Sequence, residues 1–348
     1  MKSKKLILIY FIAITIPVFA QQADLSLIPY RQGDLWGYAD AGKKIIIKPV
    51  YDQANLFYEG YASVKKGEKF GYINKAGKVL IPFNYYIAKP FRYGYFDNPA
   101  RHKTDTVLFA GASVRKDGYE ICINTKGATM PRCPAINENT VIDHFAEDTS
   151  VKTYSNIKAN GNLYDKIVDD YNVINGDDNY YIAVKNNLLG VFNNKFSVVI
   201  PFEYSSLKKL TIGAVSYLLA EKKGKQGVLN GNGSAFIAVE NATVSFAKST
   251  GGKEYFIILR ENTGSIMDTR LTKVISGNYT DIVYDKEGGF VLTGPEKMKG
   301  YYFENTKVLI NTKYADVTPV KDGNFIWVTT PAGKSGYVSS KGDDFFSE

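Results

Sequence analysis

The sequence predicts an all-β protein built from tandem repeats of about 36 residues. Three observations support this prediction: a segment that recurs at regular steps, a surplus of strand-forming residues, and no sustained helical periodicity. Aromatic residues make up 14% of the 348 residues, with 26 Tyr and 20 Phe. Such side chains suit the pleated, half-buried surface of a strand.

The recurring segment has a fixed internal spacing. It reads LWGYADAGKKIIIKPVYD from Leu35, KFGYINKAGKVLIPFNYY from Lys69 and LLGVFNNKFSVVIPFEYS from Leu188. A Tyr lies fourteen residues after the Gly in four places: Gly37 and Tyr51, Gly71 and Tyr85, Gly190 and Tyr204, Gly300 and Tyr314. Gly residues at 227, 264 and 336 continue the series in steps of 36 or 37 residues. Such repeats are expected to pack against their neighbours, because one unit cannot bury its own apolar face.

Each copy predicts a strand through the Gly, a hairpin turn and a second apolar strand. The Gly suits a close backbone approach or a β-bulge. Gly42 and Gly77 are expected at positive φ in the hairpin turns. In three copies the strand after the turn is expected to end at a proline, because proline donates no ladder hydrogen bond. These prolines are Pro49, Pro82 and Pro201. With an alternating run such as residues 60–64, one unit contains about four short strands.

The segment from Gly33 to Pro82 resembles the WG-repeat family of bacterial β-repeat proteins. The resemblance rests on the Trp-Gly-Tyr start, the Val/Ile run before Pro, the Tyr-Asp pair and the Phe-x-x-Gly-x-Ala-x-Val run, and it is specific over residues 33–92. Trp36-Gly37 is the one copy with the family dipeptide. In the other copies the Trp position is occupied by another residue: Phe70, Leu189, Gln226, Thr263, Lys299 or Ser335. The resemblance implies a repeat or interaction module. The repeats are expected to stack as an open solenoid or to close into a propeller-like ring.

The first twenty residues have the features of a signal peptide. Lys2, Lys4 and Lys5 precede the apolar run 6–16, and Val18-Phe19-Ala20 places small residues at the −3 and −1 positions of a cleavage site. We therefore expect export, cleavage after Ala20, a periplasmic or extracellular location, and one tandem-repeat domain over residues 21–348. No later run of 18 apolar residues occurs, so no transmembrane segment is expected in the mature chain.

Charge and cysteine content limit the classes of partner. The net charge of the whole chain is +8. Three of the basic residues lie in the predicted signal peptide, and the other Lys residues form scattered turn pairs rather than a basic patch, so no nucleic-acid partner is expected. In an oxidising compartment, Cys122 and Cys133 are compatible with a disulfide across eleven residues and equally with two small buried thiols.

No catalytic, metal or cofactor motif is found in the sequence. His102 and His144 are the only imidazoles, and no nucleophile motif accompanies them. The acidic run Asp177-Asp178 lacks the spacing of a calcium loop. We therefore predict a protein that is not an enzyme and has no cofactor. A hydrolase with carboxylates from neighbouring repeats remains an alternative, and it predicts acidic side chains in one partly buried pocket with raised pKa values.

One insertion marks a candidate binding site. Phe57 and Ala62 are five residues apart, whereas Phe91 and Ala112 are 21 apart, which predicts a loop insertion near residues 92–110. It contains six aromatic or basic candidates: Arg92, Tyr93, Tyr95, Phe96, Arg101 and His102. Insertions in repeat proteins often lie on the binding face. The sequence thus predicts an exported binding module for a protein, peptide or glycan of the cell envelope, with a purely structural envelope component as a further alternative.

Overall fold

The structure is a computed structural model, and it describes residues 24–98, 103–114, 116, 118–136, 163–172, 179–261, 263–321 and 323–347. In this part of the chain every regular element is a β-strand, as predicted. None of these residues belongs to a helix with the length and apolar character of a membrane span. The chain divides into two compact units, Met1–Glu138 (unit 1) and Asn139–Glu348 (unit 2). The predicted signal peptide, residues 1–20, lies outside the described residues.

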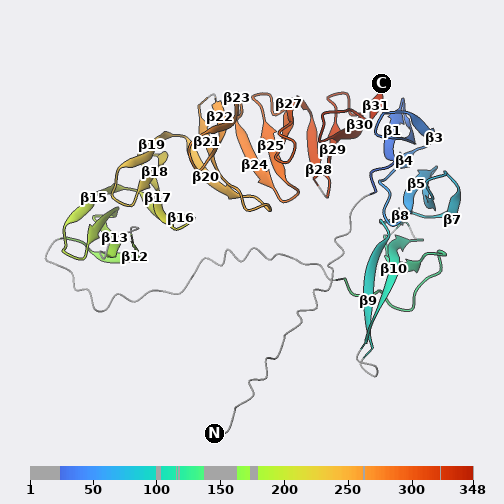
Figure 1. Ribbon diagram of the computed structural model, residues 1–348, viewed down its shortest axis with the longest axis horizontal. Helices are drawn as coiled ribbons and strands as arrows, with labels where there is room; N and C mark the ends of the chain where they lie inside the picture. The colour runs from blue at the N-terminus through green and yellow to red at the C-terminus, as the bar shows by residue number, and fades with distance from the viewer. Residues whose placement is uncertain are drawn as a thin grey trace, which may run out of the picture. The chain divides into compact units, whose positions relative to one another are not determined.

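The described strands of unit 1 form antiparallel sheets (Figure 1). The first sheet contains β1 (Ile28–Gln32), β2 (Leu35–Ala39) and β3 (Ile45–Tyr51). The second sheet contains β4 (Gln53–Ala54), β5 (Ala62–Lys66), β6 (Lys69–Ile73) and β7 (Val79–Tyr85), each paired with the next. The third sheet contains β8 (Ile87–Ala88), β9 (Arg92–Asn98), β10 (Lys103–Ser113) and β11 (Ile121–Asn124).

Unit 2 repeats the same four-stranded meander. Its sheets are β12 (Lys166–Asn172), β13 (Asn179–Lys185), β14 (Leu188–Asn193) and β15 (Val198–Tyr204); β16 (Ser206–Ile212), β17 (Val215–Lys222), β18 (Lys225–Asn230) and β19 (Ala235–Asn241); β20 (Thr243–Lys248), β21 (Glu254–Arg260), β22 (Thr263–Asp268) and β23 (Lys273–Gly277); and β24 (Asp281–Asp285), β25 (Gly289–Thr293), β26 (Lys299–Phe303) and β27 (Leu309–Tyr314). The strands β28 (Asp316–Pro319), β29 (Phe325–Thr329) and β30 (Ser335–Ser339) follow, and β31 is Phe346–Ser347. The predicted unit of about four antiparallel strands is therefore confirmed.

The spacing from Gly to Tyr is explained by the ladder between the third and fourth strands. The residue before the Gly pairs with the Tyr, as in Phe70 with Tyr85, and the next pair is Tyr72 with Ile81. Gly71 alone thus lies opposite three residues of β7, 82–84, at a bulge. A Cβ on Gly71 would lie 2.7 Å from the carbonyl oxygen of Ile81. The bulge therefore requires Gly here, as the sequence predicts.

The prediction that the proline ends the strand is wrong. Pro82 lies inside β7, and the strand continues to Tyr85. The equivalent prolines lie inside β3 and β15 at the same bulge, Pro49 and Pro201. These strands are the last in their sheets, so a residue without an N–H fits at the bulge of an edge. The prolines also limit pairing of the exposed edge with another chain.

Side-chain hydrogen bonds join each early sheet to the next. The hydroxyl of Tyr38 on β2 donates to the carbonyl of Asn55 at 2.8 Å, and that of Tyr72 on β6 donates to the carbonyl of Lys89 at 2.9 Å. Both bonds join residues seventeen positions apart. Burial raises the pKa of Tyr72. The tyrosine after the Gly therefore ties its sheet to the following one.

The turns between third and fourth strands share one geometry, set by an Asx side chain. Asn74 Oδ1 accepts the N–H groups of Ala76 and Lys78, at 3.1 and 2.9 Å. Asp40 does the same for Gly42 and Lys44 in the first sheet. The residue three positions after the Asx has positive φ.

That residue is Gly77, with φ of 76°, in the second sheet, as predicted. In the first sheet it is Lys43, with φ of 64°, and the prediction for Gly42 is wrong. The side chain that starts the turn fixes the position of positive φ, and Gly42 lies one residue too early.

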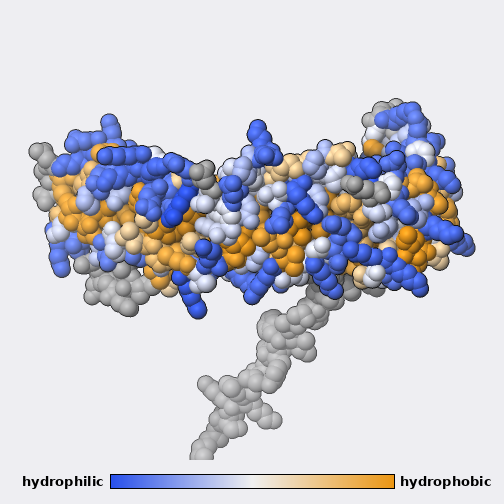
Figure 2. Space-filling model, turned by 90° about the horizontal axis from the view of Figure 1, so that it is seen from above, coloured by the Kyte–Doolittle hydropathy of each residue, from blue (hydrophilic) through white to orange (hydrophobic). Residues whose placement is uncertain are grey.

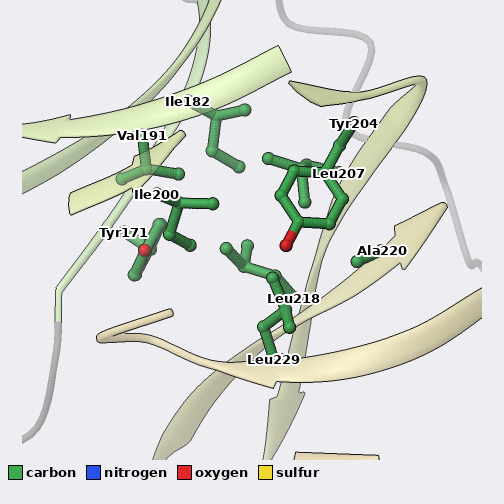
Figure 3. Packing of buried hydrophobic residues seen from close by; sticks show 9 residues of the cluster. All are labelled: Tyr171, Ile182, Val191, Ile200, Tyr204, Leu207, Leu218, Ala220 and Leu229. Carbon is green, nitrogen blue, oxygen red and sulfur yellow. The ribbon is translucent and has the colours of Figure 1, made fainter. Parts of the chain in front are cut away.

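The core is a series of apolar clusters between consecutive sheets. Figure 3 shows the cluster between the sheets β12–β15 and β16–β19: Tyr171, Ile182, Val191, Ile200, Tyr204, Leu207, Leu218, Ala220 and Leu229. Similar clusters join the later sheets of unit 2 and the second and third sheets of unit 1. Apolar residues also reach the surface among hydrophilic ones, as the orange areas in Figure 2 show. Each sheet thus buries its apolar face on a neighbour.

Candidate functional site

The predicted loop insertion is a β-hairpin. The strands β9 and β10 pair in a continuous register from Arg92 with Phe109 to Asn98 with Lys103, and Figure 1 shows them as the longest hairpin of unit 1. The alternating aromatic and small residues of this segment suit a strand, which explains why it pairs rather than forming a loop. The hairpin lies between the first and second strands of the third sheet.

The second sheet shows what the hairpin replaces. There, Tyr58 and Tyr61 exchange two backbone hydrogen bonds of 2.9 Å around the two-residue turn Glu59-Gly60. Ala62 and Val64 pair with the strand that contains Gly71, in the way that Ala110 and Ala112 pair with β11. Residues 93–108 therefore occupy the place of two turn residues. The sequence alignment, which matched Ala62 with Ala112, was two residues out of register.

One face of the hairpin is covered by protein. Arg92 and Phe109 are ladder partners, and the Arg92 guanidinium lies over the Phe109 ring at 5.6 Å. The Arg92 Nε is buried and has no hydrogen-bond partner among the described residues. Further along the same face, the Arg132 guanidinium lies over the Phe96 ring at 4.7 Å. A Cβ on Gly94 would lie 2.8 Å from the side chain of Pro134. This face packs against the segment 129–135, and we call that segment the arm.

A disulfide and backbone bonds hold the arm. Cys122 on β11 is bonded to Cys133, with a Cα–Cα distance of 5.3 Å, which decides between the two possibilities left open by the sequence. The N–H of Met130 donates to the Cys122 carbonyl at 2.7 Å. Ala135 and Tyr95 exchange two backbone hydrogen bonds of 2.9 and 2.8 Å. The arm therefore connects β11 to the outer edge of β9.

The opposite face of the hairpin is more open, and we call it the tyrosine face. Its described side chains alternate with those of the covered face and are Tyr93, Tyr95, Thr106 and Leu108. Tyr93 is 48% exposed, and Thr106 is exposed. Leu108 packs on the core cluster below. Because Tyr93 and Tyr95 are two residues apart on one strand, their Cα atoms are separated by about 7 Å.

Glu59 extends the tyrosine face. The negative charge of Glu59 raises the pKa of Tyr93, with a smaller contribution from burial. Glu59 has φ of 51°, a conformation that costs a non-Gly residue about 1–2 kcal/mol. The turn of the second sheet thus places a carboxylate beside the exposed tyrosine of the third.

The structure separates the six predicted site residues. Arg92 and Phe96 belong to the covered face, and their side chains pack against protein. Tyr93 and Tyr95 belong to the tyrosine face. Arg101 and His102 lie outside the described residues. Sequence analysis missed Glu59, although a Glu before Gly at the position of a two-residue hairpin turn is a signal, because Asn, Asp or Gly is usual there.

A hydrolase would require acidic side chains that come together at one site. Among the described residues, no cluster of His, Cys, Asp and Glu suits a metal ion. Asp285 is the one described carboxyl group with a raised pKa, and burial is the main cause. Its carboxylate accepts the Tyr301 hydroxyl at 2.5 Å and the Glu287 N–H at 2.6 Å. These bonds give Asp285 a structural role in its turn. The run Asp177-Asp178 and His144 lie outside the described residues.

Comparison with protein families matches the WG containing repeat at residues 36–70 and 70–97. This segment of the chain is similar to two WG-containing repeats. The match confirms the predicted resemblance, and it extends through the second sheet into β9. No curated protein sequence matches the chain.

Solved structures show only distant likeness. The Kluyvelomyces marxianus Hsv2 structure has a TM-score of 0.27 and 9% identity, with 51% of this chain and 63% of that chain covered. The chain thus spans less than two thirds of that protein. Dihydro-heme d1 dehydrogenase NirN in complex with DHE has a TM-score of 0.28 and 10% identity, with 93% and 73% covered. Kuenenia stuttgartiensis hydrazine synthase has a TM-score of 0.23 and 8% identity, with 82% and 93% covered. Likenesses at these TM-scores carry no information on function.

Proposed function

We propose that the chain is an exported, non-enzymatic binding module and that the tyrosine face of the β9–β10 hairpin contacts its ligand in the cell envelope. One observation carries this proposal. At a single position in unit 1, a two-residue turn of the repeat is replaced by a long hairpin that presents a half-exposed Tyr93. The scaffold itself needs no such insertion, because the second sheet closes with Glu59-Gly60.

The hairpin is held in place before any ligand arrives. Its ladder is continuous, the arm pairs with its outer edge at Tyr95, and the disulfide anchors the arm to β11. A surface that is already ordered loses little conformational entropy on binding. Tyrosine adds large contact area with only two side-chain torsions, which suits a recognition surface. These features support binding rather than a passive surface extension.

The proposed location follows from the first twenty residues. Their basic start, apolar run and Val18-Phe19-Ala20 site are typical of a Sec-type signal peptide. The disulfide Cys122–Cys133 is compatible with an oxidising compartment. A protein, peptide or glycan of the envelope is the expected class of ligand.

A hairpin replacement tests the proposal. Because Arg92 and Phe109 are ladder partners, residues 93–108 can be replaced by Glu-Gly, the turn of the second sheet, without separating the strands. The wild-type chain and this variant are incubated with envelope extract, and the captured material is quantified. We expect specific capture by the wild type and at least a tenfold loss in the variant.

The control is a second replacement that leaves the tyrosine face intact. Lys222-Lys223-Gly224-Lys225 forms the turn between β17 and β18 in unit 2, and its Lys223→Ser variant should capture as the wild type does. Equal capture by the hairpin variant and the wild type would move the site away from the hairpin. Absence of capture by a folded wild type would contradict the proposal.

A further inference from the structure

We propose that Cys133 is a site of reversible thiol–disulfide exchange, and that reduction of the Cys122–Cys133 bond there releases the arm from the β9–β10 hairpin. The co-reactant is a small-molecule thiol. The proposal concerns the arm and its state of oxidation, and it does not depend on the ligand of the tyrosine face. Three features of unit 1 support it: the accessibility of Cys133, the few contacts of the arm, and a hairpin ladder that does not include the arm.

The two cysteines of the disulfide differ in accessibility. Cys122 on β11 is 5% exposed, whereas Cys133 in the arm is exposed. A thiolate attacks one sulfur in line with the S–S bond and expels the other, and the rate depends on access to the attacked sulfur. Attack on Cys133 can come from solvent, whereas attack on Cys122 would have to pass through packed protein. The exchange should therefore start at Cys133.

Two small thiols complete the reaction. The first, as a thiolate, bonds to Cys133 Sγ, the bond between Cys122 and Cys133 breaks, and Cys122 leaves as a thiolate that takes up a proton. The second attacks the sulfur of the bound small thiol, and Cys133 leaves as a thiolate that also takes up a proton. Two electrons thus pass to the protein disulfide, and the two small thiols become one disulfide. Oxidation by that small disulfide runs the same steps in reverse.

The arm has few other contacts that would hold it after reduction. Pro134 is its one buried residue. Its other described contacts are a β-bridge at Thr129, backbone hydrogen bonds at Met130 and Ala135, and the stacking of Arg132 on an aromatic ring of β9. A segment with little apolar burial and exposed backbone bonds opens locally at a low free-energy cost. The disulfide therefore determines whether the arm stays docked.

The hairpin keeps its ladder when the arm leaves. The pairing of β9 with β10 includes no residue of the arm. Release frees the N–H and the carbonyl of Tyr95, which pair with Ala135, and it uncovers the Phe96 ring beneath Arg132. The outer edge of β9 then becomes an open strand edge. Exchange at Cys133 thus switches one segment between a docked and a released state while the sheet persists.

Reaction with glutathione tests the site of exchange. The full-length chain with its disulfide intact is incubated with reduced glutathione under native conditions, the reaction is stopped with acid, and peptide mass spectrometry locates the mixed disulfide. We expect glutathione on Cys133 in at least about tenfold excess over Cys122, because the buried sulfur is shielded from attack. Glutathione found equally on both cysteines or mainly on Cys122, or a disulfide that reacts only in denaturant, would overturn the proposal.

Trypsin reports release of the arm, because Arg132 provides a cleavage site within it. Reduction with dithiothreitol should accelerate cleavage after Arg132 at least about tenfold, since a docked segment must open before a protease can bind it. Cleavage after the exposed Lys223, in the β17–β18 turn of unit 2, is the matched control and should not change. Reoxidation with oxidised glutathione should restore the slow rate. Unchanged cleavage after Arg132 in the reduced chain would overturn the proposal.

The variant with Cys122→Ala and Cys133→Ala separates the disulfide from other effects of the thiol. It should be cleaved after Arg132 as fast as the reduced wild type, and dithiothreitol should not change that rate. A rate as slow as that of the oxidised wild type would show that the disulfide does not hold the arm, and it would overturn the proposal.

Hydrogen exchange separates local release from unfolding. After reduction, the amides of Tyr95 and Ala135 should exchange faster. Tyr58 and Tyr61 form the same kind of backbone pair in the second sheet, and their amides should keep their protection. Equal acceleration at both pairs would mean that reduction unfolds unit 1, and unchanged protection of Ala135 would mean that the arm stays docked. Either result would overturn the proposal.

Discussion

The second and third sheets of unit 1 share one strand plan and the same Asx turn at Asn74 and Asn124, and they differ at the bulge and at the first turn. Gly71 corresponds to Ile121, and Tyr72 corresponds to Cys122. In place of the bulged strand β7, the third sheet has the arm. The arm contacts β11 through a β-bridge between Ile123 and Thr129 and through the hydrogen bond from the Met130 N–H to the Cys122 carbonyl. The turn Glu59-Gly60 corresponds to residues 93–108. The third sheet therefore keeps the topology with a different set of contacts.

These differences occur together. The segment that would be the fourth strand contains two prolines, Pro131 and Pro134, whereas β7 contains one at its bulge, so this segment has one backbone donor fewer for a ladder. Without a bulged strand over β11, Ile121 is accommodated where the second sheet requires Gly71. The disulfide then holds the arm that the ladder no longer holds. The comparison teaches that the repeat can exchange hydrogen-bonded pairing for a covalent link and gain a supported hairpin.

The largest expected effect comes from removal of the disulfide. In the variant with Cys122→Ala and Cys133→Ala, we expect unit 1 to lose about 3 kcal/mol of unfolding free energy, the size typical for a closed loop of this length. Urea unfolding measures the loss. Hydrogen exchange should locate it, with faster exchange of the Met130 and Ala135 amides, both bonded across the arm.

Reduction of the wild type provides the control, because Cys133 is exposed and a soluble thiol reaches it. The reduced wild type and the double variant should show the same exchange pattern. Unchanged protection of Ala135 in both would contradict the view that the disulfide replaces the fourth-strand ladder.

The next largest loss of stability is expected when Gly71 and Ile121, which occupy the same position in the third strands of their sheets, are each replaced by the other residue. Gly71→Ile should cost about 2–3 kcal/mol, because a Cβ there would lie 2.7 Å from the Ile81 carbonyl oxygen and the strand must shift. The reverse change, Ile121→Gly, should cost about 1–2 kcal/mol through lost apolar burial and a more flexible backbone. Denaturant unfolding compares the two variants. A larger cost for Ile121→Gly would show that the bulge does not dictate the glycine.

Much of this comparison was accessible from the sequence, and the rest was hidden for physical reasons. The Gly-to-Tyr spacing predicted the strands and the bulge because side-chain size and ladder geometry act locally. Pro82 was misinterpreted, because the sequence does not show that its strand is an edge, where a bulge tolerates a residue without an N–H. The insertion was located within two residues, but its pairing into a hairpin depends on partners up to seventeen residues apart.

The candidate site was predicted less completely than the fold. The sequence identified Tyr93 and Tyr95, yet it grouped them with Arg92 and Phe96, because composition does not reveal which face the arm covers. The disulfide that holds the arm was an open question at that stage. Glu59 belongs to another repeat, and its charge acts on the pKa of Tyr93 only because neighbouring sheets pack.

The hydrogen bond between neighbouring sheets should have a moderate effect. Tyr72→Phe removes the hydroxyl that donates to the Lys89 carbonyl at 2.9 Å and should cost about 1 kcal/mol. Thermal unfolding measures the change, and Tyr38→Phe in the first sheet should match it, since that hydroxyl has the same kind of partner, the Asn55 carbonyl. Stability of both variants equal to that of the wild type would mean that these bonds do not join the sheets.

The smallest expected effect is a gain in stability. It distinguishes the contribution of backbone strain from that of packing in the hairpin turns. Lys43 and Gly77 occupy the same turn position with φ of 64° and 76°. Lys43→Gly should stabilise unit 1 by about 0.5–1 kcal/mol, because relief of the left-handed strain exceeds the entropy that glycine loses on folding. Gly77→Ala should destabilise it by a similar amount, and a Cβ there meets only an ordinary contact with Ile47 Cγ2 at 3.5 Å. Differential scanning calorimetry resolves both shifts. Gly42 lies one position earlier, outside the positive-φ position, and a Cβ there would lie 3.3 Å from Asp40 Oδ1. Gly42→Ala should therefore lower the midpoint less than Gly77→Ala does, and a larger loss would show that the Asx side chain does not determine where the turn requires glycine.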